Sequence, residues 1–490
     1  MPIGRAVMIL KKNIQKEGYI TVYLSLSLLV MLSLIFTLIE GIRMQTIRFQ
    51  TECVMDIGLN SIFAEYHREL LDQYDLFAID TTYGYEQADE ERTESHLLQY
   101  MNMNFIAPGK DRIPGYKDLT GVHADNASLS DMAYLSDGKG MVLKYQIIQY
   151  MNEKTGLSLV DNLISENISQ QATQYEGLES ERNTKHGLIN EILRELNEAR
   201  EEEEERISIN NPADQVDSMR ESSLLSFAIK NSGDISCNQI NLESYISHRG
   251  YSEGVGLWEI QEMSNGIVDK TLFQQYLVDK CGYFHEKKEQ GALEYQLEYL
   301  LYGKSSDIEN LDAFAKDVFK IRYVINAAYL FSNGTKMAEV SELAAAVTAG
   351  IMSPELYEAV KITILFAWCY AESVQDLRIL FDGKAAALVK NDGTWNIPLS
   401  ELLMFSSSLD SYKEAAGGKT YKDYLEAFLF IKEEEILRLR LMDIMEMDIR
   451  KTTGNEHFKM DACIYQLKAD VNVTSQYGYG YSISRRYSYE

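Results

Sequence analysis

Apolar positions dominate the start of the chain and become periodic only later. The stretch from Tyr19 to Ile39 carries no charged side chain, and four basic residues precede it (Arg5, Lys11, Lys12 and Lys16). As a helix this stretch would span about 31 Å, which matches the hydrocarbon core of a bilayer. A cleaved signal peptide has a shorter apolar region that ends at a small-residue site. The pattern therefore predicts a retained transmembrane helix.

The apolar periodicity continues beyond this stretch. After Arg43, apolar residues recur at helical intervals as far as Leu70, and no proline lies between Pro2 and Pro108. This predicts one helix from about residue 19 to residue 73, apolar all round in its first half and amphipathic in its second. Because basic flanks stay in the cytoplasm, we expect a single-pass protein of the cell membrane with a cytoplasmic N-terminus and its C-terminal bulk outside the cell.

Strand patterns occur near both ends of the chain. Residues 74–82 (YDLFAIDTT) predict a buried strand directly after the long helix, and residues 121–131 alternate loosely. From Cys463 to Ile483 the odd positions are mostly apolar and the even ones mostly polar, as in one bent strand or two. Since a buried strand needs hydrogen-bonding partners, we expect Leu76–Asp80 to pair in one sheet with part of Ala469–Ile483.

Helical periodicity fills the region between these strands. From about Gly291 to Leu380, apolar residues recur at three- and four-residue steps. Residues 162–206 are polar, with an acidic run at Glu201–Glu205, which is typical of an exposed hairpin or a coiled-coil arm. A short hairpin is predicted around Asn391-Asp392-Gly393.

These patterns predict an α+β fold that is predominantly α. A small sheet would join the strand after the long helix to the C-terminal strand and pack on the distal half of that helix, with a large helical domain inserted between the two strands. The expected parts are a basic cytoplasmic leader (1–18), a transmembrane helix (19–39), the first part of a membrane-proximal α+β module (40–140), a polar helical hairpin or coiled-coil arm (141–230), a helical domain (231–451) and C-terminal strands that complete the module (452–490).

Composition narrows the classes of function. The chain has 490 residues, with 47 Lys and Arg against 74 Asp and Glu, for a net charge of −27. A surface this acidic repels phosphate backbones, so no nucleic-acid partner is expected. The five cysteines are scattered singly, which indicates neither a zinc knuckle nor a disulfide framework.

Segments that resemble catalytic motifs are each incomplete. His285-Glu286-Lys287-Lys288-Glu289 begins like HExxH, but Glu289 stands where the second histidine belongs. Gly303-Lys304-Ser305 and Gly418-Lys419-Thr420 resemble the end of a phosphate-binding loop without its first glycine. We therefore expect no catalytic, cofactor-binding or metal-binding residue and no cofactor. An anchored hydrolase with a site built from dispersed carboxylates is a third, less favoured class.

The start of the chain resembles a known family. Lys16-Glu17-Gly18, followed by Tyr19-Ile20-Thr21-Val22-Tyr23, is similar to the start of TadE/TadG-type pseudopilins, which have a basic leader, a glycine at the processing point and an apolar helix. The resemblance implies a processing point between Gly18 and Tyr19. That family usually carries Glu at the fifth mature position, where this chain has Tyr23, and often an acidic residue where this chain has Glu40.

A wider resemblance covers most of the chain. It is to an uncharacterised family of membrane-anchored proteins of Gram-positive anaerobes, and its matching segments are residues 52–58, 64–70, 73–77, 294–299 and 477–481. This resemblance implies an association with Tad-like pili or secretion apparatus and brings no established activity.

The leading hypothesis is a single-pass, outward-facing structural or assembly component, pseudopilin-like, of a Tad-type pilus or secretion apparatus. Its expected partners are the lipid bilayer, other proteins of the pilus or secretion apparatus, and a second copy of the chain through the N-terminal helix. The alternative is a non-catalytic, membrane-anchored ectodomain that binds a ligand or a glycan. In both cases Tyr477, Tyr479 and Tyr481 form a candidate partner surface.

Overall fold

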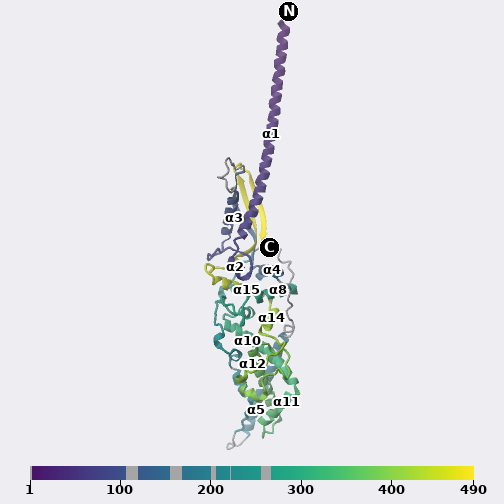
Figure 1. Ribbon diagram of the computed structural model, residues 1–490, viewed down its shortest axis with the longest axis vertical. Helices are drawn as coiled ribbons and strands as arrows, with labels where there is room; N and C mark the ends of the chain where they lie inside the picture. The colour runs from purple at the N-terminus through teal and green to yellow at the C-terminus, as the bar shows by residue number, and fades with distance from the viewer. Residues whose placement is uncertain are drawn as a thin grey trace.

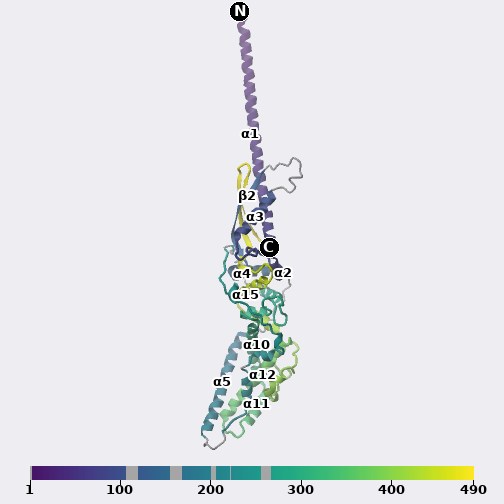
Figure 2. The same cartoon turned by 90° about the vertical axis from the view of Figure 1, so that its left-hand side faces the viewer.

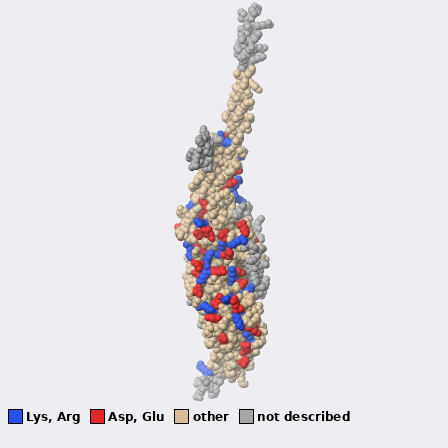
Figure 3. All heavy atoms as spheres, in the orientation of Figure 1, with Lys and Arg blue, Asp and Glu red and all other residues tan. Residues whose placement is uncertain are grey.

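A long helix, a small sheet and a helical body follow one another along the molecule (Figure 1). This computed structural model describes residues 3–105, 120–154, 168–199, 206–220, 222–254, 256 and 266–489. The N-terminus lies at the free end of the long helix, and the sheet flanks the opposite end of that helix. In Figure 3 the tan part of the projecting helix shows no charged side chains until it nears the body, whereas acidic and basic side chains cover much of the body.

The long helix α1 runs from Ile3 to Phe63. Its segment from Tyr19 onward is long and apolar enough to cross a membrane, and the most apolar window of that segment is not buried within the protein. The expected continuation to residue 73 is wrong. The chain leaves the helix after Phe63, and a separate helix α2 (Arg68–Tyr74) begins where the His67 side chain accepts a hydrogen bond from the Leu70 backbone.

The sheet has four strands: β1 (Ile79–Asp80), β2 (Val122–Tyr134), β3 (Cys463–Ser475) and β4 (Gly480–Ser488). All pairings are antiparallel, and β3 pairs with each of the other three. The predicted fold class is confirmed, because the strand after the long helix and the C-terminal strands share this sheet. The C-terminal pattern forms two strands joined by a turn.

The register of β1 differs from the expected one. Ile79 lies opposite Ile464 and Asp80 opposite Cys463, at the start of β3 and outside Ala469–Ile483. Residues 469–475 of β3 instead pair with β2 on one side and with β4 on the other, where Val471 lies opposite Ile483. β1 is short because the rest of the predicted strand turns away to pack Leu76 into the core of the helical body.

The distal half of α1 and helix α3 (Glu90–Phe105) share a core with the sheet. From α1 it contains Val54, Met55 and Leu59, and from β3 the alternating apolar residues that the sequence pattern predicted. The helices approach closely at Gly58, where an added Cβ would lie 2.9 Å from Cγ of Met101. The predicted packing of the sheet on the distal half of the first helix is therefore observed.

The inserted body is helical and centres on α12 (Pro354–Phe381), which is buried along most of its length. Its other helices are α4 (Asp137–Lys154), α5 (Ile168–Glu198), α6 (Pro212–Met219), α7 (Leu224–Ala228), α8 (Ile267–Lys280), α9 (Gln296–Tyr302), α10 (Asp307–Ser332), α11 (Gly334–Val347), α13 (Phe405–Ser408), α14 (Tyr421–Ile431) and α15 (Glu434–Arg450). Short 3-10 helices lie at Ser232–Asp234, Leu242–Ser244, Leu399–Met404 and Met460–Ala462.

Helix α5 is not the exposed hairpin or coiled-coil arm that its polar composition suggested. It is one helix that packs along α10 and α12 (Figure 2). Ile189 is buried there, and Leu178, Leu188 and Ile192 pack half-buried against the same core. Helix α5 packs against the body along only one side, so it needs few apolar residues to be held there. The acidic run Glu201–Glu205 lies outside the described residues.

Candidate functional site

A line of exposed apolar side chains follows α1 beyond its apolar span. Ile42 is 66% exposed, Phe49 70% and Ile57 45%. The exposed thiol of Cys53 lies in the same line. The steps of seven, four and four residues place these positions on one side of the helix, opposite the side that packs on α3 and the sheet. We call these four residues the α1 stripe.

The α1 stripe is suited to contact another helix. Single exposed apolar residues are ordinary on protein surfaces. Here, however, they recur over about four helical turns and continue the apolar surface of the span. Apolar residues at such spacings form the seam when two helices pack together. The sequence predicted that this part of α1 is amphipathic, but only the positions of α3 and the sheet reveal which of its apolar residues stay exposed.

The candidate partner tyrosines lie at the turn between β3 and β4 and at the start of β4, and they contact α1. The guanidinium group of Arg43 lies 4.0 Å from the ring centre of Tyr477. Nε of Arg48 donates a hydrogen bond of 3.2 Å to the hydroxyl oxygen of Tyr479, and its guanidinium group lies 5.8 Å from the ring centre of Tyr481. The structure thus brings the three tyrosines together beside the helix.

The two residues at the predicted processing point lie elsewhere. Gly18 and Tyr19 are inside α1, and Tyr19 is exposed. Tyr19 is 24 residues before Arg43, so about 36 Å of helix separates the two. The processing point and the tyrosine surface are therefore at opposite ends of the apolar span.

A second candidate site is a cleft of about 1190 Å³ between α5, α7 and α10. Its walls combine three aromatic side chains with five basic and three acidic ones: Tyr175, Phe319, Tyr370, Arg182, Arg220, Lys230, Lys316, Lys320, Glu179, Glu309 and Asp312. Several of the charges are already paired. Arg220 lies 2.9 Å from Glu179, and Lys316 lies 2.6 Å from Asp312. The sequence analysis missed this cleft because its residues come from distant segments without a shared motif.

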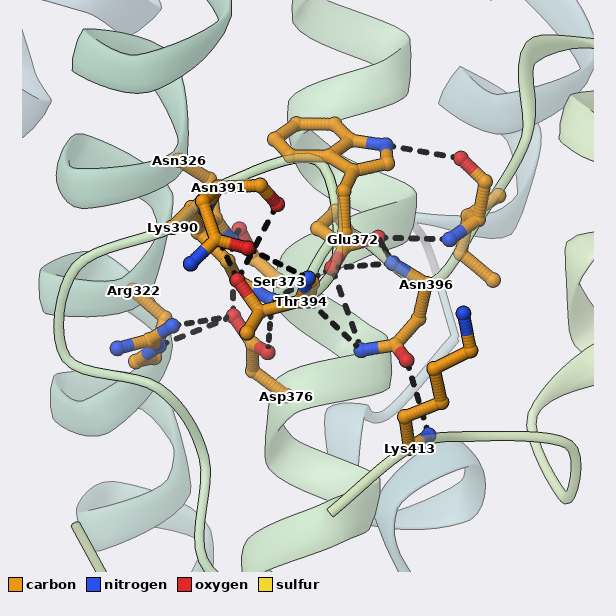
Figure 4. A network of polar contacts seen from close by, with 12 residues as sticks. Arg322, Asn326, Glu372, Ser373, Asp376, Lys390, Asn391, Thr394, Asn396 and Lys413 are labelled. Carbon is orange, nitrogen blue, oxygen red and sulfur yellow. Dashed lines mark hydrogen bonds and ion pairs between the residues drawn. The ribbon is translucent and has the colours of Figure 1, made fainter. Parts of the chain in front are cut away.

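Figure 4 shows a network of buried charges in the helical body. Nη2 of Arg322 on α10 lies 2.8 Å from Oδ2 of Asp376 on α12. Nζ of Lys390 lies 2.5 Å from Oε1 of Glu372 and 2.7 Å from Oδ1 of Asp376. All four side chains are buried, so two positive charges balance two negative ones inside the core.

This network holds the segment after α12 in place. Backbone N–H groups of Asn396 and Ile397 donate hydrogen bonds to Glu372. The segment therefore follows α12 as a loop, and the hairpin predicted around Asn391-Asp392-Gly393 is wrong. Burial raises the pKa of Glu372. For Asp376 burial acts in the same direction, but the charges of Arg322 and Lys390 outweigh it and lower the pKa. The four charged side chains of the network bond to one another and to neighbouring groups inside the core, so we assign the network a structural role.

The incomplete motifs serve local structure. Nε2 of His285 lies 3.1 Å from the carbonyl oxygen of Phe381, and burial lowers the pKa of this histidine. Gly303 ends α9 with a left-handed φ of 63°, and Thr420 caps α14. Within the described ranges, no group of three or more His, Cys, Asp and Glu side chains is arranged to hold a metal ion.

Comparison with known proteins gives one match. The model of a family of unknown function (DUF5702) matches residues 198–475, from the end of α5 to the end of β3. No curated protein and no solved structure matches the chain. The matched range contains the helices of the body from α6 to α15 and the central strand β3, and α1, α2, α3, α4 and β2 lie before it.

Proposed function

The chain belongs to the family of unknown function DUF5702, and from its geometry we propose that it is a membrane-anchored structural or assembly protein, a pseudopilin-like component of a Tad-type pilus or secretion apparatus. In this proposal α1 serves as both anchor and assembly helix. The sheet module keeps the helix upright, and the helical body projects away from the membrane as an interaction domain. The N-terminus lies in the cytoplasm and the body outside the cell.

The α1 stripe is the observation that supports this proposal. Ile42, Phe49 and Ile57 remain exposed although the opposite side of the same helix is buried. Covering them with a second α1 would remove three large apolar side chains from water, at about 1.5–3 kcal/mol for each side chain that becomes fully buried. A second copy inserted in the same bilayer presents its own stripe at the same height, so the two stripes face each other in register.

Cys53 provides a direct test because it lies within the α1 stripe. Disulfide formation requires two Cα atoms about 4.4–6.8 Å apart, so oxidation of native membranes should cross-link copies whose stripes are packed together. We expect a cross-linked dimer that disappears in Cys53→Ser. Cys237, the other exposed cysteine, lies in the helical body, and Cys237→Ser should leave the cross-link in place.

A further variant separates packing from anchoring. Phe49→Glu places a charge in the centre of the stripe and should reduce the Cys53 cross-link strongly, while the protein stays in the membrane fraction. Asp56→Glu, on the exposed side of the same helix, is the matched control and should cross-link normally. A cross-link that forms only through Cys237, or one that Phe49→Glu leaves unchanged, would contradict assembly through this surface.

The cleft supports a second candidate function, an anchored ectodomain that binds a ligand or a glycan. Aromatic and basic side chains gather there in a chain whose net charge is −27. If this candidate is correct, Arg182→Ala should abolish binding of the full-length protein on a glycan array and leave the Cys53 cross-link unchanged. If the assembly proposal is correct, the cross-link should respond to Phe49→Glu whatever the array shows.

A further inference from the structure

The turn between β3 and β4 is an ordered, exposed projection. We call residues 476–479 the hairpin tip. The N–H of Ser475 donates to the carbonyl oxygen of Tyr479 at 2.9 Å, and the N–H of Gly478 donates to that of Ser475 at 2.9 Å. Gly478 has a φ of 77°, which favours glycine at this position. The N–H of Gln476 donates to Gly121 at 3.0 Å, so the tip is also held to the start of β2.

The hairpin tip points toward the apolar span. In Figures 1 and 2 the sheet runs beside α1, and the turn between β3 and β4 lies at the end nearer the N-terminus of that helix. Two contacts along α1 fix this direction. Arg43 meets Tyr477 at the tip, whereas Asn60, further along the helix, accepts a hydrogen bond from Tyr487 near the end of β4. The tip is thus the part of the β3–β4 hairpin closest to the apolar span.

The helix gives the depth of the tip relative to a bilayer. The uncharged stretch ends at Ile39, and Arg43 lies four residues later, about 6 Å along the helix axis. The headgroup region on each side of the hydrocarbon core is about 5–7 Å thick. Since the Arg43 guanidinium group lies 4.0 Å from the centre of the Tyr477 ring, that ring lies at the level of the headgroups when residues 19–39 span the bilayer.

The chemistry of the tip matches this depth. Tyr477 is 50% exposed, so half of its surface is available to a further contact. Tyrosine is enriched at membrane–water interfaces because its ring is apolar and its hydroxyl group is polar. Arg43, which also forms an ion pair of 2.7 Å with Glu40, lies beside the tip at the depth of the lipid phosphate groups. Arg48 lies five residues further along the helix, about 14 Å beyond Ile39, and holds Tyr479 on the aqueous side of this layer.

We propose that the hairpin tip is a phospholipid-binding site that inserts Tyr477 into the interfacial layer of the membrane crossed by α1. The sheet module then contacts the membrane at two points, the helix and the tip. Two contacts restrict the tilt and rotation of α1, and with them the direction in which the α1 stripe faces. This inference requires that α1 spans a bilayer and is independent of the proposed assembly with a second copy.

Tryptophan fluorescence tests the contact in the full-length protein. Tyr477→Trp is reconstituted at one chain per nanodisc, in phospholipid brominated near the headgroup end of its acyl chains. Tyr85→Trp is the matched control, because Tyr85 is 61% exposed and lies just before α3, at the end of the module far from the tip. The signal of the native protein, which contains three tryptophans, is subtracted in both cases.

We expect the bromines to quench the added tryptophan of Tyr477→Trp at least about twofold more than that of Tyr85→Trp. Equal quenching of the two variants would overturn the proposal. Because each nanodisc holds one chain, a failure of assembly cannot mimic either result.

A spin label provides a second measurement if tryptophan disturbs the turn. Tyr477→Cys and Tyr85→Cys are each labelled in a Cys53→Ser/Cys237→Ser background, which removes the two exposed native thiols. Oxygen concentrates in the bilayer and a charged nickel chelate is excluded from it. The ratio of oxygen to nickel accessibility should therefore be higher at position 477 than at position 85. Equal ratios would overturn the proposal.

Discussion

The hydroxyl group of Tyr74 donates a hydrogen bond of 2.8 Å to Oδ2 of Asp448, across 374 positions of the chain. Tyr74 ends α2, directly after the anchor helix, and Asp448 lies on α15 of the helical body. Asp448 also accepts hydrogen bonds from Nε2 of Gln296 at 2.7 Å and from the N–H of Ala292 at 2.8 Å. This buried carboxylate therefore ties the membrane-proximal module to the body.

Asp448→Ala should strongly destabilise the protein. It removes the acceptor of three donors and leaves the buried side chains of Tyr74 and Gln296 without this partner, at a cost of about 3 kcal/mol in the free energy of unfolding. Tyr74→Phe removes one donor and should cost about 1 kcal/mol. Denaturant unfolding of the full chain in detergent measures both. Equal stability of Asp448→Ala and the native protein would refute the role of this carboxylate.

Stability should fall as pH rises toward neutrality because of Glu298. Burial raises the pKa of this glutamate from 4.5 to about 7. Between these values the folded chain holds a proton that the unfolded chain releases, so rising pH favours unfolding by about 3 kcal/mol across this range.

Glu298→Gln tests this pH dependence. Since glutamine does not titrate, the variant should lose most of the decline in the free energy of unfolding between pH 4.5 and 7. Glu294→Gln, a partly exposed neighbour in the same segment, should retain it. A decline of the same size in Glu298→Gln would assign the effect to another group.

Lys390→Met should destabilise the helical body. It removes the cation that lies between Glu372 and Asp376 and leaves their charges partly unbalanced in the core, at a cost of about 3–5 kcal/mol. The double variant Lys390→Met/Glu372→Gln removes one charge of each sign and should recover part of the loss. Thermal unfolding checks both, and a double variant less stable than Lys390→Met would contradict this charge balance.

The orientation of the chain can be tested at Cys237. The basic residues before Tyr19 predict that the helical body lies outside the cell. In a Cys53→Ser background, a membrane-impermeant maleimide should therefore label the exposed Cys237 in intact spheroplasts. The Cys53→Ser/Cys237→Ser variant gives the background signal. Labelling that requires lysis of the spheroplasts would reverse the proposed orientation.

Processing of the N-terminus is a separate prediction. If the resemblance to pseudopilins is functional, a peptidase cuts after Gly18 and the mature chain begins at Tyr19. N-terminal sequencing of the protein purified from its own membrane should then give Tyr19 as the first residue. A start at Met1 or Pro2 would identify an unprocessed anchor, and the α1 stripe would remain available in either case.

The end of the first helix shows where local pattern fails. Apolar residues keep their helical phase through Leu70, so the sequence predicted an unbroken helix. In the fold, Leu70 and Tyr74 belong to the core of the helical body, whereas Ile62 and Phe63 belong to the core of the sheet module. The chain must turn between the two cores, and it does so where Tyr66 bridges to Ile79.

Local spacing by itself determined the apolar span from Tyr19 to Ile39, the strand alternation from Cys463 onward and the predominantly helical insertion, because each depends on residues a few positions apart. Only the tertiary structure decided which side of α1 stays open. Burial of Val54 and exposure of Phe49 follow from the positions of α3 and the sheet. The contact of Tyr477 with Arg43 likewise joins opposite ends of the chain. Such relationships depend on the packing of segments hundreds of residues apart, which no short stretch of sequence encodes.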